Sequence, residues 1–186
     1  MQTEVNNAIK ILKQGGIILY PTDTVWGIGC DATNFDAIEK IFKLKKRNES
    51  KSLICLVSDL NMLNYYIQSF PEAAYDILKY ANKPTTIIYD KPVRVAKNLI
   101  AQNNTLAIRI VDDGFTNQLI RKLRQPIVST SANISGKSTP KSFKDISEHI
   151  IKGVDYVVNL PHEKKATKPS SIIKLTNDGQ VRIIRQ

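Results

Sequence analysis

An α/β fold, built as one domain over residues 1–186, is what the sequence predicts. The length suits a single domain that can bury a core. Helical and strand-like patterns alternate along the chain, without a repeat or a low-complexity block. The last strand patterns, near 154–160, 171–175 and 181–185, follow one another without a helix between them. Because parallel neighbours usually need a helical crossover, we expect a mixed parallel and antiparallel sheet.

The first elements are the most clearly marked. Apolar residues recur at helical spacing across 4–14, and Gly15-Gly16 is placed to end that helix. Ile17 to Tyr20 is typical of a short buried strand. Asn34 is placed to cap a second helix whose acidic residues come early and whose basic residues come late, the order that the helix dipole favours.

The rest of the chain alternates in the same way. Runs rich in β-branched residues predict strands, and amphipathic patterns predict helices. Besides the three C-terminal strands, the expected strands are 53–57, 85–89, 106–111 and 126–129, and the expected helices are 60–68, 71–81, 115–123 and 142–151. The polar segment 161–169, which a proline bounds at each end, predicts a mobile loop.

Composition excludes several classes of protein. No apolar run approaches the length of a membrane span, and the N-terminus lacks the layout of a signal peptide, so we expect a cytoplasmic protein that does not enter a membrane. Cys30 and Cys55 are too few and too far apart in sequence to suggest a disulfide or a zinc site. The net charge of +10 suits a polyanionic partner or an anionic substrate. A soluble protein that is merely rich in lysine would show the same excess.

Two hydroxyl-rich segments follow apolar strands. In "YPTDTVWGIG", residues 20–29, two threonines, an aspartate and two glycines come after the first strand. In "IVSTSANISG", residues 127–136, four hydroxyl side chains and an asparagine follow Ile127-Val128. Ordinary turns would account for both segments. A surface that holds phosphate oxygens or a carboxylate would account for them equally, because ligands bind at strand ends in open α/β sheets.

Basic residues occur where they could complete such a site. In "KLKKRNESKSL", residues 43–53, Lys45, Arg47 and Lys51 could face one anion, although a well-capped helix end with solvated lysines has the same pattern. Arg109 interrupts the apolar strand "LAIRIV" and needs an anionic partner if it points inward. A cationic groove that accepts a carboxylate and phosphates would be lined by Thr22, Thr24, Lys45, Arg47, Lys51, Arg109, Ser131 and Asn133.

The usual signatures of covalent or metal catalysis are missing. The sequence contains neither a P-loop nor a G-x-G-x-x-G turn after the first strand. It has no Cys/His pair at nucleophile spacing, and no cluster of histidines and carboxylates announces a catalytic metal. We therefore assign no nucleophile, no acid or base, and no metal ligand.

Four ordered motifs resemble the YrdC-like family, the L-threonylcarbamoyladenylate synthases. "GGIILYPTDTVWGIGCDA" is similar to the opening of that family, and "KLKKRNESKSL" to its K-x-R segment. "LAIRIV" resembles its arginine-bearing strand and "STSANISG" its S-x-N motif. The likeness runs from about residue 7 to 185, which is nearly the whole chain.

The resemblance implies a fold, a reaction and a set of site residues. The fold would be a twisted mixed sheet flanked by helices around a basic cavity. Family members condense L-threonine, bicarbonate and ATP, with Mg²⁺ carried on the ATP phosphates, into threonylcarbamoyl-AMP and pyrophosphate. Other tRNA threonylcarbamoyl-transfer proteins then modify tRNA, and the sequence leaves open whether this chain contacts tRNA itself. By resemblance the ATP and its phosphates would be held by Lys45, Arg47, Ser131, Asn133, Thr86 and Arg185. The threonine would be held by Thr22, Thr24, Lys51, Arg109, Ser129 and Ser170.

Departures from the family pattern and two alternatives accompany the resemblance. "YANKPTTII" replaces a W-P-G-P-L-T run that is usual in the family, and "ATKPSSII" lacks a glutamate common before the serines, so the adenine and threonine pockets match less closely than the phosphate site. One alternative is a non-catalytic module of the same fold that binds double-stranded RNA or tRNA. The other is a paralogue that acts on a different substrate.

Overall fold

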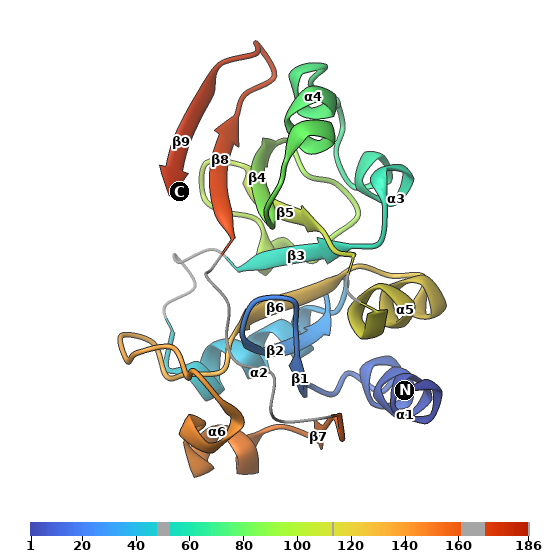
Figure 1. Ribbon diagram of the computed structural model, residues 1–186, viewed down its shortest axis with the longest axis vertical. Coiled ribbons are helices and arrows are strands. Elements are labelled where there is room, and N and C mark those ends of the chain that lie inside the picture. The colour runs from blue at the N-terminus through green and yellow to red at the C-terminus, as the bar shows by residue number, and fades with distance from the viewer. Residues whose placement is uncertain (48–52, 113, 161–169, 186) are drawn as a thin grey trace.

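Nine strands of the described chain form one mixed sheet that extends through the whole molecule (Figure 1). The computed structural model describes residues 1–47, 53–112, 114–160 and 170–185. The strand order is β7-β1-β2-β6-β3-β5-β4-β8-β9, which begins with β7 at the bottom of Figure 1 and ends with β4, β8 and β9 side by side in its upper part. Pairs β1·β7, β3·β5 and β4·β8 are parallel, and the other five are antiparallel. The predicted α/β fold with a mixed sheet is confirmed.

The elements follow the order that the sequence predicts, with a few differences. The strands are β1 Ile18–Pro21, β2 Trp26–Asp31, β3 Ile54–Val57, β4 Thr85–Asp90, β5 Thr105–Ile110, β6 Ile127–Ser131, β7 Tyr156–Val157, β8 Ser171–Leu175 and β9 Val181–Arg185. The helices are α1 Gln2–Lys13, α2 Phe35–Lys45, α3 Leu60–Tyr65, α4 Ala73–Tyr80, α5 Gly114–Leu123 and α6 Glu148–Gly153. Two 3₁₀ turns are η1 Lys97–Leu99 and η2 Phe143–Asp145. Among the described residues, no helix combines the length and the apolarity needed to cross a membrane.

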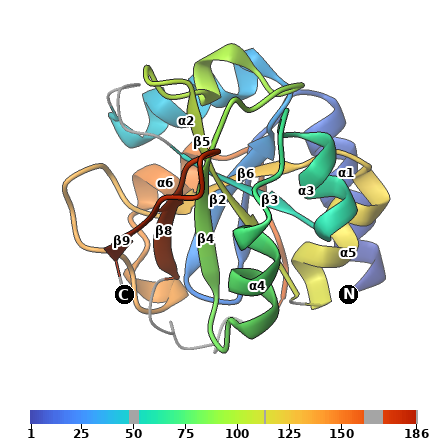
Figure 2. The same ribbon diagram turned by 90° about the horizontal axis from the view of Figure 1, so that it is seen from above.

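The sheet separates two apolar clusters. One cluster joins α1 and α5 to strand residues such as Tyr20 and Leu56. The other joins α2, α3, α4 and α6 to residues such as Cys55 and Ile87. Since Cys55 and Leu56 are neighbours in β3, they point to opposite faces of the sheet. Figure 2 shows α1 and α5 side by side, at the opposite end of the molecule from β8 and β9. At the β8–β9 end of the molecule, the Leu56 face of the sheet is therefore not covered by α1 and α5.

The predicted helix cap is confirmed, and two predicted spans are wrong. The Asn34 side chain accepts a hydrogen bond from the Ala37 amide at 3.0 Å at the start of α2. The expected helix over 142–151 is split, because the chain leaves η2 in an extended conformation at Ile146 before α6 begins. The strand expected over 154–160 pairs only at Tyr156 and Val157, next to β1. The loop prediction for 161–169 lies outside the described residues.

Strand β2 was not predicted, because two glycines and a polar turn hide it. Glycine is rare in strands, since it packs nothing and loses much entropy on folding. Here the glycines permit close packing: a Cβ at Gly29 would lie 2.7 Å from the Val128 carbonyl oxygen and 2.8 Å from Cε1 of Tyr20. The hydroxyl-rich segment "YPTDTVWGIG" is therefore a β-hairpin that joins β1 to β2.

Candidate active site

A cavity of about 360 Å³ lies on the Leu56 face of the sheet, and residues from most of its strands line it. Eight of the twelve residues predicted for the site are among the lining residues: Thr22, Thr24, Arg47, Arg109, Ser129, Ser131, Ser170 and Arg185. Three of these side chains are arginines, and no described lining residue is acidic. Segments that are distant in the sequence therefore converge on one hollow.

Strand register builds an apolar floor for this cavity. Ser129, Ile54, Ala107 and Ile88 stand opposite one another across β6, β3, β5 and β4, and all four line the cavity. Residues of one row point to the same face of a sheet, so their side chains form a continuous surface. An apolar floor with a few polar groups around it is the usual composition of a small-molecule site.

The β1–β2 turn forms one wall of the cavity, and Thr22 holds that turn together. The Thr22 hydroxyl donates to the Val25 carbonyl at 2.7 Å and accepts from the Thr24 and Val25 amides at 3.1 and 3.2 Å. Gly27 lets the wall approach β6, since a Cβ there would lie 3.1 Å from both Ser129 Oγ and Thr22 Cγ2. The segment is thus a tight turn and also a cavity wall, so the interpretation as a turn and the interpretation as a ligand-facing surface do not exclude each other.

Arg109 points inward and is paired with a carboxylate. Its Nη2 lies 2.9 Å from Oδ1 of Asp23, and the two side chains are 5% and 21% exposed. The Arg109 Nε is buried and has no hydrogen-bond partner among the described residues. The need for an anionic partner was predicted, but Asp23 was not assigned to the site. An unpaired guanidinium nitrogen at the cavity wall favours a ligand that accepts hydrogen bonds.

Lys45 is buried behind the cavity lining and holds a backbone loop. Its side chain is 1% exposed and is not among the lining residues. The ammonium donates to the carbonyl oxygens of Ser131 and Asn133, at 2.5 and 2.6 Å, and the Lys45 carbonyl accepts from the Ser135 amide at 2.8 Å. The K-x-R and S-x-N segments, 86 residues apart at Lys45 and Ser131, are thus joined.

Arg47, two residues after Lys45, places a positive charge at the cavity wall. It follows Lys46, whose left-handed φ of 49° ends α2, and it is half-buried at the cavity wall. Burial lowers the pKa of Arg47. Burial and then the charge of Arg47 lower the pKa of Lys45 to about 8. The two cations of the K-x-R segment therefore have different positions: one supports the loop and the other faces the hollow.

The S-x-N side chains are connected within their own loop. The Ser131 hydroxyl donates to Asn133 Oδ1 at 2.5 Å. The Asn133 amide nitrogen donates to the carbonyl oxygens of Ile134 and Lys137 at 3.0 and 2.6 Å. Ser131 lines the cavity and Asn133 does not. Asn133 therefore fixes the shape of the loop that presents Ser131.

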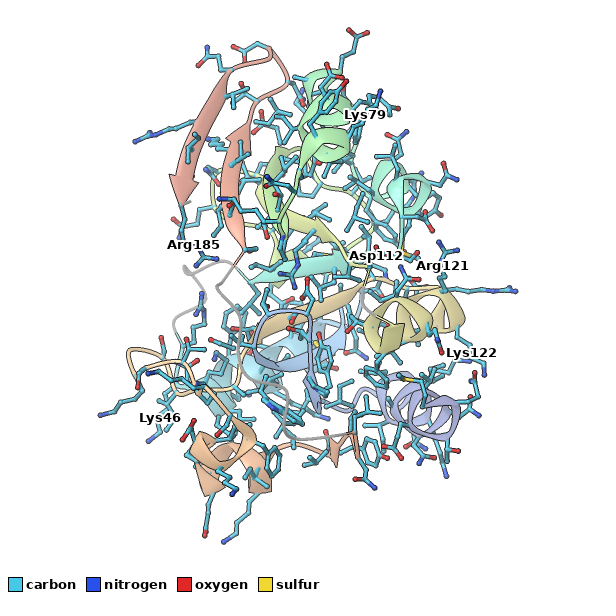
Figure 3. The ribbon with its side chains drawn as sticks, in the orientation of Figure 1. Lys46, Lys79, Asp112, Arg121, Lys122 and Arg185 are labelled. Carbon is cyan, nitrogen blue, oxygen red and sulfur yellow. The ribbon has the colours of Figure 1, made fainter. Side chains whose placement is uncertain are left out.

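A second cluster of polar side chains, from β4, β9 and the residue before β8, lies at another wall of the cavity. Ser170 Oγ lies 2.9 Å from Thr86 Oγ1, and the guanidinium of Arg185 donates to the Ser170 carbonyl from Nε at 3.0 Å and from Nη2 at 2.8 Å. Ser170 and Arg185 line the cavity, whereas Thr86 is fully buried behind Ser170. Figure 3 shows Arg185 at the end of β9 that faces the middle of the molecule.

The structure thus separates the predicted residues into three groups. Eight line the cavity, and three, Lys45, Asn133 and Thr86, contact residues that line it. Lys51 lies outside the described residues. Two lining hydroxyls, Thr130 and Thr139, were not predicted. Thr130 stood inside the quoted S-x-N segment, whereas nothing around Thr139 marked it.

Comparison with known proteins gives the chain a family. The family described as "Telomere recombination", which covers Sua5, YciO and YrdC, matches residues 10–186. The chain belongs to this family. It is 33% identical over 178 residues to a protein of Pseudoalteromonas translucida named threonylcarbamoyl-AMP synthase, covering 92% of each chain. It is 32% identical over 182 residues to the protein of that name from Saccharophagus degradans, covering 96% of this chain and 94% of that one.

Solved structures agree with the family assignment. E. coli YciO has a TM-score of 0.85 at 25% identity, covering 100% of this chain and 90% of that one. The P. abyssi Sua5 complex with L-threonine has a TM-score of 0.81 at 26% identity and covers 92% of this chain. This chain spans half of that longer Sua5 chain. The fold predicted from the resemblance, a mixed sheet flanked by helices, is that of these relatives.

The side chains around the cavity suit phosphate and carboxylate oxygens better than a bare metal ion. Guanidinium and hydroxyl groups donate hydrogen bonds to anions. Among the described residues, no group of three or more His, Cys, Asp or Glu could hold a metal. A divalent ion would therefore find few protein ligands on the described walls, and phosphate oxygens and water would have to supply the remainder.

Proposed function

We propose that this chain is an L-threonylcarbamoyladenylate synthase, which condenses L-threonine, bicarbonate and ATP to threonylcarbamoyl-AMP and pyrophosphate. The observation that carries the proposal is the convergence of Arg47, Ser131 and Arg109 on one cavity in a chain of this family. The relatives named as synthases favour this function over a non-catalytic RNA-binding module.

The chemistry needs no protein nucleophile. The threonine amine and bicarbonate first join to give N-carboxythreonine, with loss of water. Its carbamate oxygen attacks the α-phosphorus of ATP, the P–O bond to the β-phosphate breaks, and pyrophosphate leaves. Catalysis of such a step depends on positioning the reactants and on stabilising negative charge. Arginine and hydroxyl donors in a partly closed hollow can do both.

We divide the residues of the site between the two substrates. Arg47 and Ser131 would bind ATP phosphates, with Lys45 and Asn133 supporting them through the loop, and Arg185 and Thr86 would complete the ATP contacts. Arg109, with Thr22, Thr24, Ser129 and Ser170, would bind the threonine. Lys51 remains a predicted threonine contact, and Mg²⁺ would enter on the ATP phosphates. Transfer to tRNA by partner proteins, and contact with tRNA, remain part of the proposal.

One assay tests the function. Purified protein receives ATP, Mg²⁺, bicarbonate and labelled threonine, and threonylcarbamoyl-AMP and pyrophosphate are measured. We expect both products to form only when threonine and bicarbonate are present. Pyrophosphate release that ignores threonine would instead indicate a paralogue with another substrate. Salt-sensitive tRNA binding without ATP turnover would indicate an RNA-binding module.

A further inference from the structure

A second groove, of about 380 Å³, lies on the opposite face of the strands that close the first cavity. Alternation along the strands divides neighbouring residues between the two hollows. Ile184 of β9 lines the first cavity, whereas Ile183 lines the second groove. Ile172 of β8 lines the first, and its neighbours Ser171 and Ile173 line the second. The β8–β9 hairpin is therefore a shared partition between two hollows.

The lining of the second groove combines apolar surface with positive charge. The apolar part comes from Ile173 and Ile183 of the hairpin and from Ile77 of α4, and the basic residues are Lys83 and Arg185. No described residue that lines it is acidic. Tyr80 adds a ring that is 73% exposed at the end of α4, where Lys79 lies 5.3 Å from the ring centre (Figure 3).

A buried hydroxyl in the groove lacks a partner. Ser171 is 6% exposed and lines the groove, and its Oγ makes no hydrogen bond to any described residue. Buried polar atoms in folded proteins nearly always have a partner, so an orphan of this kind indicates a missing one. A rotation of the Ser171 side chain to another rotamer would turn Oγ towards the groove, where a ligand that accepts or donates a hydrogen bond could supply the partner.

Arg185 is common to the two hollows. It lines both, and its bonds to the Ser170 carbonyl use Nε and Nη2. A guanidinium has five N–H donors, so Nη1 is left for another acceptor within the described surroundings. An anion bound at Nη1 in the second groove would act on the same rigid guanidinium that holds the Ser170 carbonyl, and Ser170 lines the first cavity.

We propose that this groove is a second binding site, for a small organic anion with an apolar or aromatic body, and that Arg185 couples it to the first cavity. The volume lies in the range of small-molecule sites. The apolar residues would bind the body of the ligand, and Lys83 and Arg185 its anionic group. Because coupling between sites is reciprocal, ligands in the first cavity would change the affinity of the second groove by the same factor.

The fluorescent aromatic sulfonate 8-anilino-1-naphthalenesulfonate is a suitable probe, and two adjacent isoleucines provide matched variants. Ile183 and Ile184 are 58% and 51% exposed and point to opposite faces. We expect I183S and K83Q each to weaken probe binding by about fivefold, the scale of a partly lost apolar contact or charge pair. I184S should leave it unchanged. Equal affinity in wild type, I183S and K83Q would overturn the site.

Nuclear magnetic resonance tests the coupling without any substrate, so its outcome is independent of the proposed function. The Nε–H resonance of Arg185, assigned with R185K, reports the bond to Ser170. We expect the probe to shift this resonance in wild type and in I184S at the same probe concentration, and I183S to need about fivefold more probe for the same shift. Probe binding in the groove with an unmoved Arg185 resonance would overturn the coupling.

Discussion

Two buried cations support the first cavity, and the protein compensates their charges in different ways. Lys45, at the corner between α2 and β6, donates to two neutral backbone carbonyls. Arg109, in β5, pairs with the carboxylate of Asp23 in the β1–β2 turn. A neutral amine can still donate to two carbonyls, whereas an ion pair depends on both charges. The contact between α2 and β6 at Lys45, called the scaffold corner below, therefore tolerates loss of charge. The Arg109–Asp23 pair does not.

The largest effect should come from breaking the ion pair. Asp23→Asn leaves the guanidinium of Arg109 buried without an anion, and we expect it to lower the free energy of unfolding by about 2–4 kcal/mol. Denaturant unfolding of the two proteins measures this difference.

A double-mutant cycle separates the pair from other effects of Asp23. In an Arg109→Leu background the buried charge is gone, so Asp23→Asn should cost little. A full-size effect of Asp23→Asn in that background would show that the carboxylate stabilises the turn by itself, and the contrast between the two regions would fail.

The next effect concerns the cation that faces the cavity from the scaffold corner. Arg47→Ala removes a charged donor from the cavity wall. We expect it to slow ATP-dependent turnover by raising the activation free energy by about 1.5–3 kcal/mol. Its stability should change little, since Arg47 is only half-buried. Lys46→Asn is the matched control, because it removes the adjacent exposed charge and asparagine tolerates the left-handed backbone. Equal losses in both variants would mean that general charge, and not the position of Arg47, matters.

The sequence predicts the elements and the list of site residues better than it predicts what each residue does. Asn34 caps α2 as expected because capping depends on local spacing alone. Lys45 and Arg47 look alike in the sequence, and only their positions after folding separate a loop support from a cavity residue. Asp23 was missed as the partner of Arg109 because the two lie 86 residues apart. Strand β2 was missed because its glycines serve packing against β1 and β6, which no local pattern reveals.

A smaller effect should follow from removing the scaffold amine. Lys45→Met leaves the carbonyls of Ser131 and Asn133 without their donor, and we expect a loss of about 1–3 kcal/mol in unfolding free energy. The Ser135 amide donates to the Lys45 carbonyl and the Lys137 amide donates to the Ile134 carbonyl, and hydrogen exchange at both amides should also become faster in the ligand-free protein. Lys43→Met, two residues earlier and exposed on the same helix, should change neither. Unchanged exchange together with lost ATP binding in Lys45→Met would mean that the ammonium contacts the nucleotide directly.

The smallest effect is a dependence on pH, and its sign follows from the lowered pKa of Lys45. Burial, with the charge of Arg47, lowers this pKa from 10.5 to about 8, so above pH 8 the unfolded chain binds more protons than the folded one. The contribution of Lys45 to the free energy of unfolding therefore rises with pH from about 8 towards 10.5. Below pH 8 the buried amine is charged, and this charge lowers the free energy of unfolding. We expect wild type to gain about 1 kcal/mol relative to Lys45→Met between pH 8 and 9. A constant difference across that interval would mean that the amine stays charged, and that the scaffold corner, like the ion pair, depends on its charge.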